Sequence, residues 1–226
     1  MAQRFLDIIL VCLALIILSP LFAVVIVVLS ITGEKEVFFR QTRVGKNGNR
    51  FSLLKFATML KDSPNMNTGS VTIKNDPRVL PFGKFLRKTK INELPQLINI
   101  LSGEIGLIGP RPLTEETFKM YSFEVQTQIM KVRPGLSGIG SIVFRDEEEI
   151  LTGDYANTET YQSFIAPYKG ELEVWYAHNH NFTIYSLAIF VTVWSVIWPR
   201  SSLVWDVFPT LPSPPAELKD KLNYPL

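Results

Sequence analysis

The chain of 226 residues is poor in cysteine and in charge. Its one cysteine, Cys12, excludes an internal disulfide, which fits a reducing compartment. Charged residues make up 19% of the sequence, below the usual level of about a quarter, and the formal net charge is +2. Because this charge is weak and no basic-aromatic motif is present, the sequence gives no indication of nucleic-acid binding. The length fits one domain with its own core.

Common catalytic and metal-binding motifs are missing as well. Gly45–Gly48 lacks the Lys-Ser/Thr ending of a phosphate-binding loop, and the chain has no Gly-x-Ser-x-Gly nucleophile motif. His178 and His180 stand two residues apart without a cluster of carboxylates or cysteines beside them. A structural metal site needs more ligands than this, so the pair is only a weak indication of metal.

The chain does contain a long apolar run near its N-terminus. No charged residue falls between Ile8 and Ile31, and as a helix these 24 residues would extend about 36 Å, enough for a hydrocarbon core of about 30 Å. A cleaved signal peptide is the competing interpretation. The run exceeds a typical signal core, however, and no small-x-small cleavage site follows cleanly. We therefore expect a segment that stays in the membrane.

Ser19-Pro20 interrupts this run near its middle, and proline bends a helix because it removes a backbone donor. The run is either a kinked span, which physics alone favours slightly, or a re-entrant helix that returns to the face it entered. The positive-inside rule places the body in the cytoplasm, because five basic residues follow the run closely. They are Lys35, Arg40, Arg43, Lys46 and Arg50.

A second apolar run, Phe182–Trp198, has 17 residues and is marginally long for a span. Aromatic residues at its ends suit a membrane interface. A buried core helix fits the same run equally well, so both interpretations stay open.

Elsewhere, apolar periodicity alternates with turn residues. Residues 33–60 are predicted to form strand, turn and strand, and residues 61–80 a loop. Helices are expected over 81–89, from an N-cap at Asn92 to a stop at Gly103, and over Leu113–Val132, started by Thr114. The remaining expectations are a turn-rich break at Arg133–Gly138, a solvated helix start at Asp146–Glu149 and an extended tail at Pro209–Leu226.

Cationic residues gather around the helix expected at Asn92. Arg87 and Lys88 precede its N-terminus, where free N–H groups and the helix dipole favour anions. Arg111 stands between Pro110 and Pro112, which restrict the backbone that carries its planar guanidinium. The pattern predicts a phosphate site. The alternative is an exposed basic patch near anionic lipid headgroups.

One carboxylate, Glu93, falls in the first turn of the same expected helix. An ionised carboxylate beside a phosphate site is a natural Mg²⁺ ligand, and Asp76 is a second candidate. The alternatives are charge complementarity with the helix dipole for Glu93, and turn initiation for Asp76 in its Asp-Pro pair.

Short motifs follow one another along the chain in an order that matches a known family. They are Ser19-Pro20, Phe39–Gly45, Lys55–Met59, Asn75–Val79, Phe82–Thr89, Asn92–Leu97, Gly109–Pro112 and Arg133–Gly138. Over nearly all of residues 4–200 the chain resembles the bacterial sugar transferases, the monotopic phosphoglycosyl transferases that begin cell-surface glycan assembly.

The resemblance implies an enzyme that moves a sugar-1-phosphate from a UDP-sugar to a polyprenol (undecaprenyl) phosphate and releases UMP. It implies Mg²⁺, a re-entrant helix broken at Ser19-Pro20 in place of the full span, and a body on the cytoplasmic face of the bacterial inner membrane. It also implies a covalent intermediate on an Asp of an Asp-Glu pair. The cations that would line the phosphate site here are Arg78, Arg87, Lys88, Arg111 and Arg145.

The chain departs from that family pattern at several positions. Asn92 stands where the resemblance implies the nucleophilic Asp, and Glu93 matches the Glu. A neutral amide is a poor nucleophile, so the protein either uses Glu93, transfers directly, or is impaired. Ala57 replaces an Arg or Lys, and Glu173 falls where Asp is common. Arg145-Asp146 stands where the family often has Gly-Arg-Asn.

We therefore predict a helix-rich mixed α/β fold, associated with the membrane, with interfacial amphipathic helices. Residues 1–32 would form the re-entrant membrane helix, 33–208 the cytoplasmic-face transferase domain and 209–226 the tail. Asn92 and Glu93 are the catalytic candidates, with Glu93 on Mg²⁺. The partners are a UDP-sugar, polyprenol phosphate and membrane lipid, with no nucleic acid and with a homodimer left open. A catalytically impaired binding or scaffold protein is the alternative function.

Overall fold

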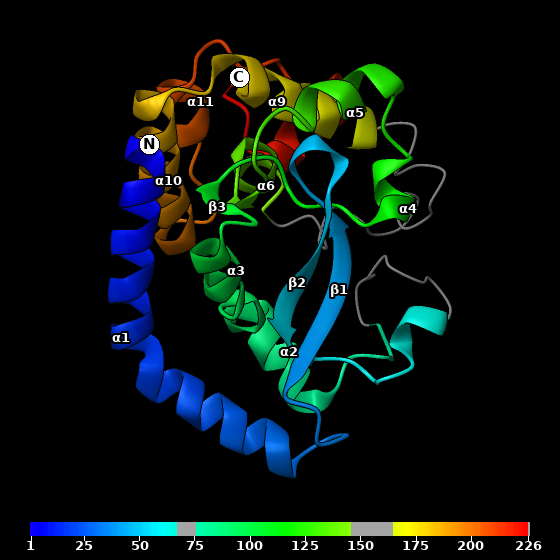
Figure 1. Ribbon diagram of the computed structural model, residues 1–226. Helices are drawn as coiled ribbons and strands as arrows, with labels where there is room; N and C mark the ends of the chain where they lie inside the picture. The colour runs from blue at the N-terminus through cyan, green and yellow to red at the C-terminus, as the bar shows by residue number, and fades with distance from the viewer. Residues whose placement is uncertain (67–75, 146–164, 226) are drawn as a thin grey trace.

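The computed structural model describes residues 1–66, 76–145 and 165–225 (Figure 1). In this part of the chain, helices surround two small two-stranded sheets, which confirms the helix-rich mixed class. The predicted helix start at Asp146–Glu149 lies outside the described residues. The N-terminal half contains α1 (Ala2–Ile31), β1 (Phe38–Val44), β2 (Arg50–Phe56), α2 (Pro81–Lys88), α3 (Gln96–Ser102) and β3 (Gly106–Ile108).

The second half of the described chain is mostly helical. Its elements are α4 (Glu115–Phe118), α5 (Phe123–Ile129), β4 (Gly135–Ser137), α6 (Ile139–Val143), α9 (Ala166–Asn179), α10 (Phe182–Ile197) and α11 (Leu203–Val207). Short 3-10 turns connect or follow these elements at Lys46–Gly48, Ser63–Asn65, Ile91–Glu93, Ala216–Leu218 and Asp220–Leu222.

Helix α1 holds the predicted apolar run and contains Pro20. Pro20 has no N–H to donate to the Ile16 carbonyl one turn earlier, and the Ser19 hydroxyl donates to that carbonyl instead at 2.8 Å. The helix bends sharply partway along (Figure 1), as expected for an interior proline. The Ser-Pro pair therefore bends α1 without leaving the freed carbonyl unpaired.

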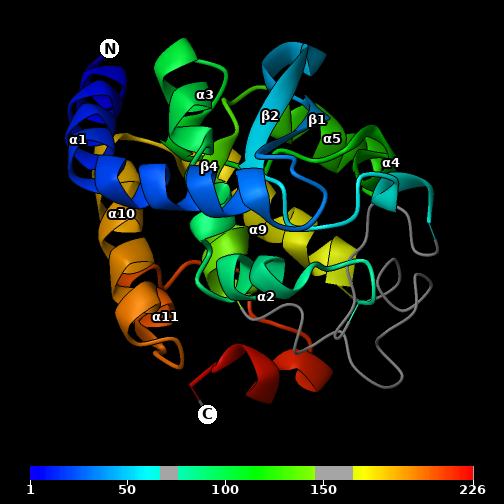
Figure 2. The same cartoon turned by 90° about the horizontal axis from the view of Figure 1, so that it is seen from below.

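The bend in α1 gives the molecule an inner and an outer side. The β1–β2 hairpin, α2 and α3 lie on the inner side (Figure 1). Helix α10 runs beside the first limb of α1, the part before the bend, and the part after the bend is its second limb. Seen from below, the second limb crosses the molecule (Figure 2). Val11, Val25 and Leu29 point inward and are buried against the body. The outer face is a row of exposed apolar side chains: Phe5, Ile8, Ile9, Leu13, Ile16, Ile17, Val24, Val27 and Ile31.

Length and composition make α1 a candidate membrane segment. It has 30 residues, and only 11% of its most apolar window is buried inside the protein. A core helix of a water-soluble protein would bury far more, so the exposed apolar face needs a lipid or protein partner. This observation supports membrane association.

Strands β1 and β2 form the predicted antiparallel hairpin. Phe38 pairs with Phe56 and Val44 with Arg50, and the turn between them uses left-handed backbone at Asn47 (φ 58°) and Gly48 (φ 77°). The turn cluster read from the sequence is thus confirmed, because asparagine and glycine are the residues that adopt this conformation most readily.

Helix α2 confirms the prediction over 81–89, whereas the start of the next helix was wrong. Asn92 lies in the 3-10 turn Ile91–Glu93, and α3 begins only at Gln96, after Pro95 at its N-cap. Asn92 is 5% exposed and caps nothing. The stop at Gly103 is confirmed, with φ 85° at the C-cap.

Two predictions about the following segment were also wrong. The single helix over Leu113–Val132 is two short helices, α4 and α5, although Thr114 does cap the first by accepting from the Thr117 N–H. The turn-rich break at Arg133–Gly138 contains β4, which pairs with β3 in parallel. A Cβ on Gly135 would lie 2.1 Å from the Gly109 nitrogen, so this close pairing requires glycine.

The main core gathers α6, α9, α10, α11 and the C-terminal segment. Helix α10 satisfies both interpretations of the second apolar run in part. Tyr185, Ala188 and Val191 are buried in the core, while Phe190, Val193, Val196 and Ile197 are exposed on the opposite face. At 16 residues it extends about 24 Å. It is therefore a core helix whose outer face continues the apolar surface of α1.

The C-terminal segment is not the extended tail that was expected. It contains the turns Ala216–Leu218 and Asp220–Leu222, and Leu211, Leu218 and Leu222 are buried in the main core. The prolines prevent regular helix here, but the apolar residues between them still find core positions.

Candidate functional site

The centre of the candidate site is the Glu93 carboxylate with two cations beside it. Glu93 Oε1 lies 3.4 Å from Lys55 Nζ and 3.9 Å from an Arg111 guanidinium nitrogen. The three residues come from the turn before α3, the end of β2 and the loop after β3. The structure therefore brings together Glu93 and Arg111, as the sequence predicted, and adds Lys55.

Local backbone features position these three side chains. Lys90 adopts left-handed backbone with φ 59°, which turns the chain after α2 and directs the 3-10 turn that carries Glu93. Pro110 and Pro112 flank Arg111, and a Cβ on the preceding Gly109 would lie 2.3 Å from the Arg133 carbonyl oxygen. The Gly-Pro-Arg-Pro turn is thus held against the β4 segment by direct backbone contact.

Arg43 of β1 adds a further cation. Its guanidinium donates to the Pro112 carbonyl at 3.1 Å and to the Gln41 amide oxygen. Burial, followed by the charge of Arg111, lowers the pKa of Arg43 to about 10, against a smaller opposing effect of Glu93. Arg43 thus joins the turn that carries Arg111 to the hairpin.

The cluster contains more positive than negative side chains, and burial together with their mutual charges shifts their pKa values. Burial lowers the pKa of Lys55 to about 8, which Glu93 opposes while Arg43, Arg111 and Arg87 add to the lowering. Burial acts to raise the pKa of Glu93, but Lys55, Arg111 and Lys90 outweigh it and lower that pKa to about 2. A polyanionic ligand would relieve the repulsion among the cations.

A second carboxylate, Glu173 of α9, lies behind the Arg111 turn. It is 3% exposed, and its Oε1 accepts from the Arg111 backbone N–H at 3.3 Å. Burial raises the pKa of Glu173 to about 7, although Arg111 and Lys169 act to lower it. A Cβ on Gly140 would lie 2.5 Å from Glu173 Oε1, so the longer glutamate fits because residue 140 is glycine.

In the described residues, three buried side-chain atoms have no hydrogen-bond partner, and all belong to this site or adjoin it. They are Arg43 Nε, Asn92 Oδ1 and Glu173 Oε2. An unpaired buried polar atom costs about 1–3 kcal/mol, so native structures keep few of them. Arg43 Nε is a donor that a ligand oxygen can accept from, whereas Asn92 Oδ1 and Glu173 Oε2 are acceptors that suit a donor or a cation. The surplus of positive charge is therefore the feature that favours an anionic ligand.

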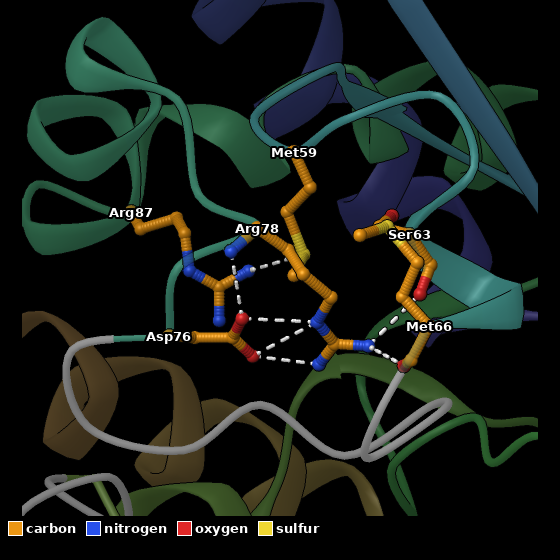
Figure 3. A network of polar contacts seen from close by, with 6 residues as sticks. All are labelled: Met59, Ser63, Met66, Asp76, Arg78 and Arg87. Carbon is orange, nitrogen blue, oxygen red and sulfur yellow. Dashed lines mark hydrogen bonds and ion pairs between the residues drawn. The ribbon is translucent and has the colours of Figure 1, made fainter.

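Arg87 lies next to this cluster and also faces a separate polar network. One of its guanidinium nitrogens is 3.9 Å from Met59 Sδ, and its charge acts on Lys55. Figure 3 shows Arg87 pointing toward Asp76 and Arg78. The nearby Lys88 is exposed at the end of α2. Arg87, Glu93 and Arg111 thus belong to neighbouring parts of one cationic region.

Asp76 and Arg78 bind each other in a buried ion pair. Arg78 is 1% exposed, its guanidinium lies 2.6 Å from Asp76 Oδ2, and it donates to the carbonyls of Ser63 and Met66 at 2.9 and 3.0 Å (Figure 3). These bonds join residues 63–66 to residues 76–78 within the segment between β2 and α2. Phosphate binding by Arg78 and metal binding by Asp76 stay predictions, and the observed bonds favour a structural role.

Arg145 lies at the end of α6, where it lines a small hollow with Lys221 and Asn223 of the C-terminal segment. His178 and His180 are exposed near the end of α9, and His178 Nε2 is 3.2 Å from the Gln128 amide oxygen. Among residues 1–66, 76–145 and 165–225, no group of three or more His, Cys, Asp or Glu side chains could hold a metal by itself.

Sequence reasoning missed the roles of Arg43 and Lys55, although both lie in motifs that carry the resemblance. The available signal was alternation, because Arg43 and Lys55 fall on the same face of the hairpin in the register that pairs Phe39 with Lys55 and Arg43 with Phe51. Each strand thus carries one cation on the same face of the hairpin. Together with the conformationally restricted Arg111 turn, this pattern would have indicated Arg43 and Lys55 as site residues.

Known proteins resemble the chain over most of its length. An exopolysaccharide production protein, ExoY, of Rhizobium meliloti (strain 1021) is 32% identical over 178 residues, which cover 73% of this chain and 78% of that protein. An uncharacterized sugar transferase, EpsL, of Bacillus subtilis (strain 168) is 33% identical over 177 residues, which cover 78% of this chain and 77% of that protein.

A longer relative is the UDP-glucose:undecaprenyl-phosphate glucose-1-phosphate transferase of Escherichia coli (strain K12). It is 34% identical over 173 residues, which cover 75% of this chain but only 36% of that protein. The profile of bacterial sugar transferases matches residues 1–199, a range that includes Lys55, Glu93, Arg111 and Glu173. The chain therefore belongs to the bacterial sugar transferase family.

Proposed function

We propose that the protein transfers a sugar-1-phosphate from a UDP-sugar to a polyprenol phosphate and so starts the assembly of a cell-surface glycan. The observation that carries the proposal is the surplus of cations around Glu93, where Lys55, Arg111 and Arg43 act on one carboxylate. A nucleoside diphosphate-sugar supplies the negative charge that this site lacks. The printed names of the relatives, exopolysaccharide production and undecaprenyl-phosphate transfer, point to the same reaction.

In the proposed reaction, an oxygen of the lipid phosphate attacks the β-phosphorus of the UDP-sugar. A new phosphorus–oxygen bond forms, the bond to the bridging oxygen breaks, and UMP leaves with that oxygen. Lys55 and Arg111 stabilise the charge that develops on the transferred and leaving groups, which is the main task of a phosphoryl-transfer site. Arg87 and Lys88 lie nearby and hold the phosphate of the polyprenol acceptor.

Asn92 makes direct transfer the route that we favour. A neutral amide lacks the charge of a carboxylate nucleophile, and Glu93 is bound by two cations that reduce its reactivity. Intact mass spectrometry after incubation with UDP-sugar alone tests this step. We expect no added mass. A gain of one sugar phosphate that maps to Glu93 would replace direct transfer with a covalent route.

The donor set fits Mg²⁺ bound mainly through substrate. Mg²⁺ is usually held by one or two protein oxygens together with phosphate oxygens and water. Glu93 supplies an ionised carboxylate, and the unpaired Asn92 Oδ1 supplies a buried oxygen in the same turn. Bound there, the ion would neutralise charge on the diphosphate. Chelation with EDTA should weaken UDP binding measured by calorimetry, and added Mg²⁺ should restore it.

We further propose that α1 is re-entrant and that the body lies on the cytoplasmic face of the bacterial inner membrane. The bend at Ser19-Pro20, the lipid-compatible outer face and the basic residues after α1 support this arrangement. It places the cationic site where a water-soluble nucleotide-sugar and a lipid phosphate can meet. The homodimer stays a prediction.

The reaction is tested by UMP release from a panel of UDP-sugars, with the purified protein in lipid nanodiscs containing undecaprenyl phosphate and Mg²⁺. We expect release with at least one sugar, and its loss in Glu93→Gln and Arg111→Met. Lys119→Met is the matched control, because Lys119 is exposed directly after α4 and pairs with Glu115. Folded protein that releases no UMP with any sugar would refute the proposal.

A second candidate function is a non-catalytic binding protein that retains the nucleotide site. Asn92 in place of a nucleophilic Asp, and Ala57 in place of a cation, favour it. Asn92→Asp distinguishes the two functions. If the substitution creates activity where the native chain has none, the native protein is a binder. If it lowers an existing activity, Asn92 belongs to a working site.

A further inference from the structure

A hollow of about 180 Å³ lies where the end of α1 meets the chain that leaves β2 and the start of α2. Its walls are mostly apolar and include Leu29, Ala57, Met59, Leu80 and Phe82, and two carboxylate residues, Glu34 and Glu36, also line it. Ala57 is the position where the sequence departs from the expected cation. A long side chain would occupy this space, so the alanine leaves it open.

The hollow continues the face of β2 that carries Lys55. Lys55, Ala57 and Met59 are alternate residues, and the chain stays extended after β2, because the Ala57 N–H donates to the Val37 carbonyl and Met59 bridges to Val79. Alternate residues of extended chain point to one side and lie about 6.6 Å apart. The space beside Ala57 is therefore one side-chain position away from the Lys55–Glu93 pair.

A second contact joins the hollow to the cationic region. Met59 lines the hollow, and its sulfur lies 3.9 Å from a guanidinium nitrogen of Arg87. An apolar compartment thus adjoins cations on two sides, at Lys55 and at Arg87. A ligand that suits both parts must carry an anionic group directly on an apolar chain.

The wall formed by α1 adjoins the apolar outer surface. Leu29 and Thr32 line the hollow, while Val27 and Ile31 of the same turns are exposed on the outer face. A chain in the hollow would therefore lie beside the part of α1 that we expect to contact lipid. A nucleotide-sugar has no apolar chain of this kind, whereas a polyprenol phosphate does.

We propose that this hollow holds the isoprene units nearest the phosphate of the polyprenol phosphate acceptor, with that phosphate against Arg87 and Lys55. The inference rests on the proposed function and adds a chain-binding pocket to it. The pocket exists because residue 57 is alanine. It orients the acceptor by its chain, which compensates for the cation that is missing at this position.

The test fills the hollow with Ala57→Leu and measures equilibrium binding of undecaprenyl phosphate to the protein in nanodiscs by native mass spectrometry. The affinity should fall about tenfold or more, as expected for losing a buried apolar contact. Ala23→Leu is the matched control, because it makes the same change on the exposed side of α1 and should leave the affinity unchanged. UDP affinity should be the same in all three proteins.

Several outcomes would overturn the inference. Undecaprenyl phosphate binding that is unchanged in Ala57→Leu would exclude the hollow as its site. Equal loss of phosphatidylglycerol binding would make it a general lipid groove. Equal loss of UDP binding would indicate a distorted site. If the native protein binds undecaprenyl phosphate but releases no UMP, the proposed function fails while the pocket is still tested by binding.

Discussion

The buried Glu173 predicts an unusual dependence of stability on pH. Its folded-state pKa of about 7 lies above the ordinary value of 4.5, because burial disfavours the charged form. Between these two values the folded protein binds a proton that the unfolded chain releases. Below pH 4.5 Glu173 therefore does not reduce the free energy of unfolding, and this free energy falls as pH rises from 4.5 through 7.

The size of this loss follows from the two pKa values. A separation of about 2.5 units corresponds to about 3 kcal/mol between pH 4.5 and pH 8, at about 1.4 kcal/mol for each unit. Full weight is appropriate because the side chain is only 3% exposed. For a chain of this size, such a loss lowers the melting temperature by roughly 6–12 °C.

Glu173→Gln should remove this loss. Glutamine keeps the Oε1 acceptor for the Arg111 N–H, carries no charge and places an amide where Oε2 has no partner. Thermal unfolding of both proteins in nanodiscs from pH 5 to pH 8.5 measures the difference. We expect the variant to gain on the native protein as pH rises. Glu171→Gln, on the exposed side of the same helix, should follow the native curve. A difference between Glu173→Gln and native protein that stays constant across pH would refute the reasoning.

Three further predictions concern the cationic site, the buried ion pair and the bend. Because the pKa of Lys55 is lowered to about 8, UDP affinity measured by calorimetry should fall roughly tenfold from pH 7 to pH 9.5. Lys55→Arg should abolish most of this fall, because arginine stays charged over this range. An equal fall in both proteins would count against a role of Lys55 in binding UDP. Asp76→Asn leaves the Arg78 charge buried without its partner, so it should reduce the free energy of unfolding by about 3 kcal/mol, while Asp62→Asn at an exposed position should change it little. Pro20→Ala restores the N–H that bonds the Ile16 carbonyl and should straighten α1. A cysteine introduced at Ala2 in a Cys12→Ser background should then be labelled from the opposite side of the membrane. Labelling from the original side would disprove the role of the proline.

The parts of the fold that the sequence predicted are those with local causes. Apolar periodicity indicated α3 although not its first residue, turn residues defined the β1–β2 hairpin, and the absence of charge defined α1. Strands β3 and β4 could not be predicted in this way. Each has three residues, and their pairing joins residues 106–108 to 135–137 through glycines that allow close backbone approach. Glycine and proline in both segments indicated turns, because the sequence does not show which backbone lies opposite.

The site was predictable where one residue type restricts the chemistry, and not where packing decides. Arg111 between two prolines and Glu93 among cations were found because a restricted guanidinium and an ionised carboxylate are the groups that phosphate and Mg²⁺ binding require. Asn92 was assigned to a cap from its residue type, but it lies buried in a 3-10 turn instead. Lys55 and Arg43 come from the hairpin, and their approach to Glu93 depends on how the hairpin packs against α3.

The first turns of α1 also connect the membrane segment to the site. Arg4 donates to the carbonyls of Ile100 and Leu101 at the end of α3, the helix that follows Glu93. Asp7 accepts from the Tyr185 hydroxyl, which in turn accepts from the Leu107 N–H of β3 at 3.1 Å, just before the Arg111 turn.

Helix α3, which follows Glu93, and strand β3, which precedes Arg111, are therefore bonded to the same stretch of α1. A shift of that stretch in the membrane would move both elements, and with them the separation of 3.9 Å between the carboxylate and the guanidinium. A polar residue such as Asp7 is costly in an apolar helix unless it is bonded, and its bonds here run toward the site. The proposed placement of α1 in the membrane is thus coupled to the geometry of the cationic cluster through these bonds.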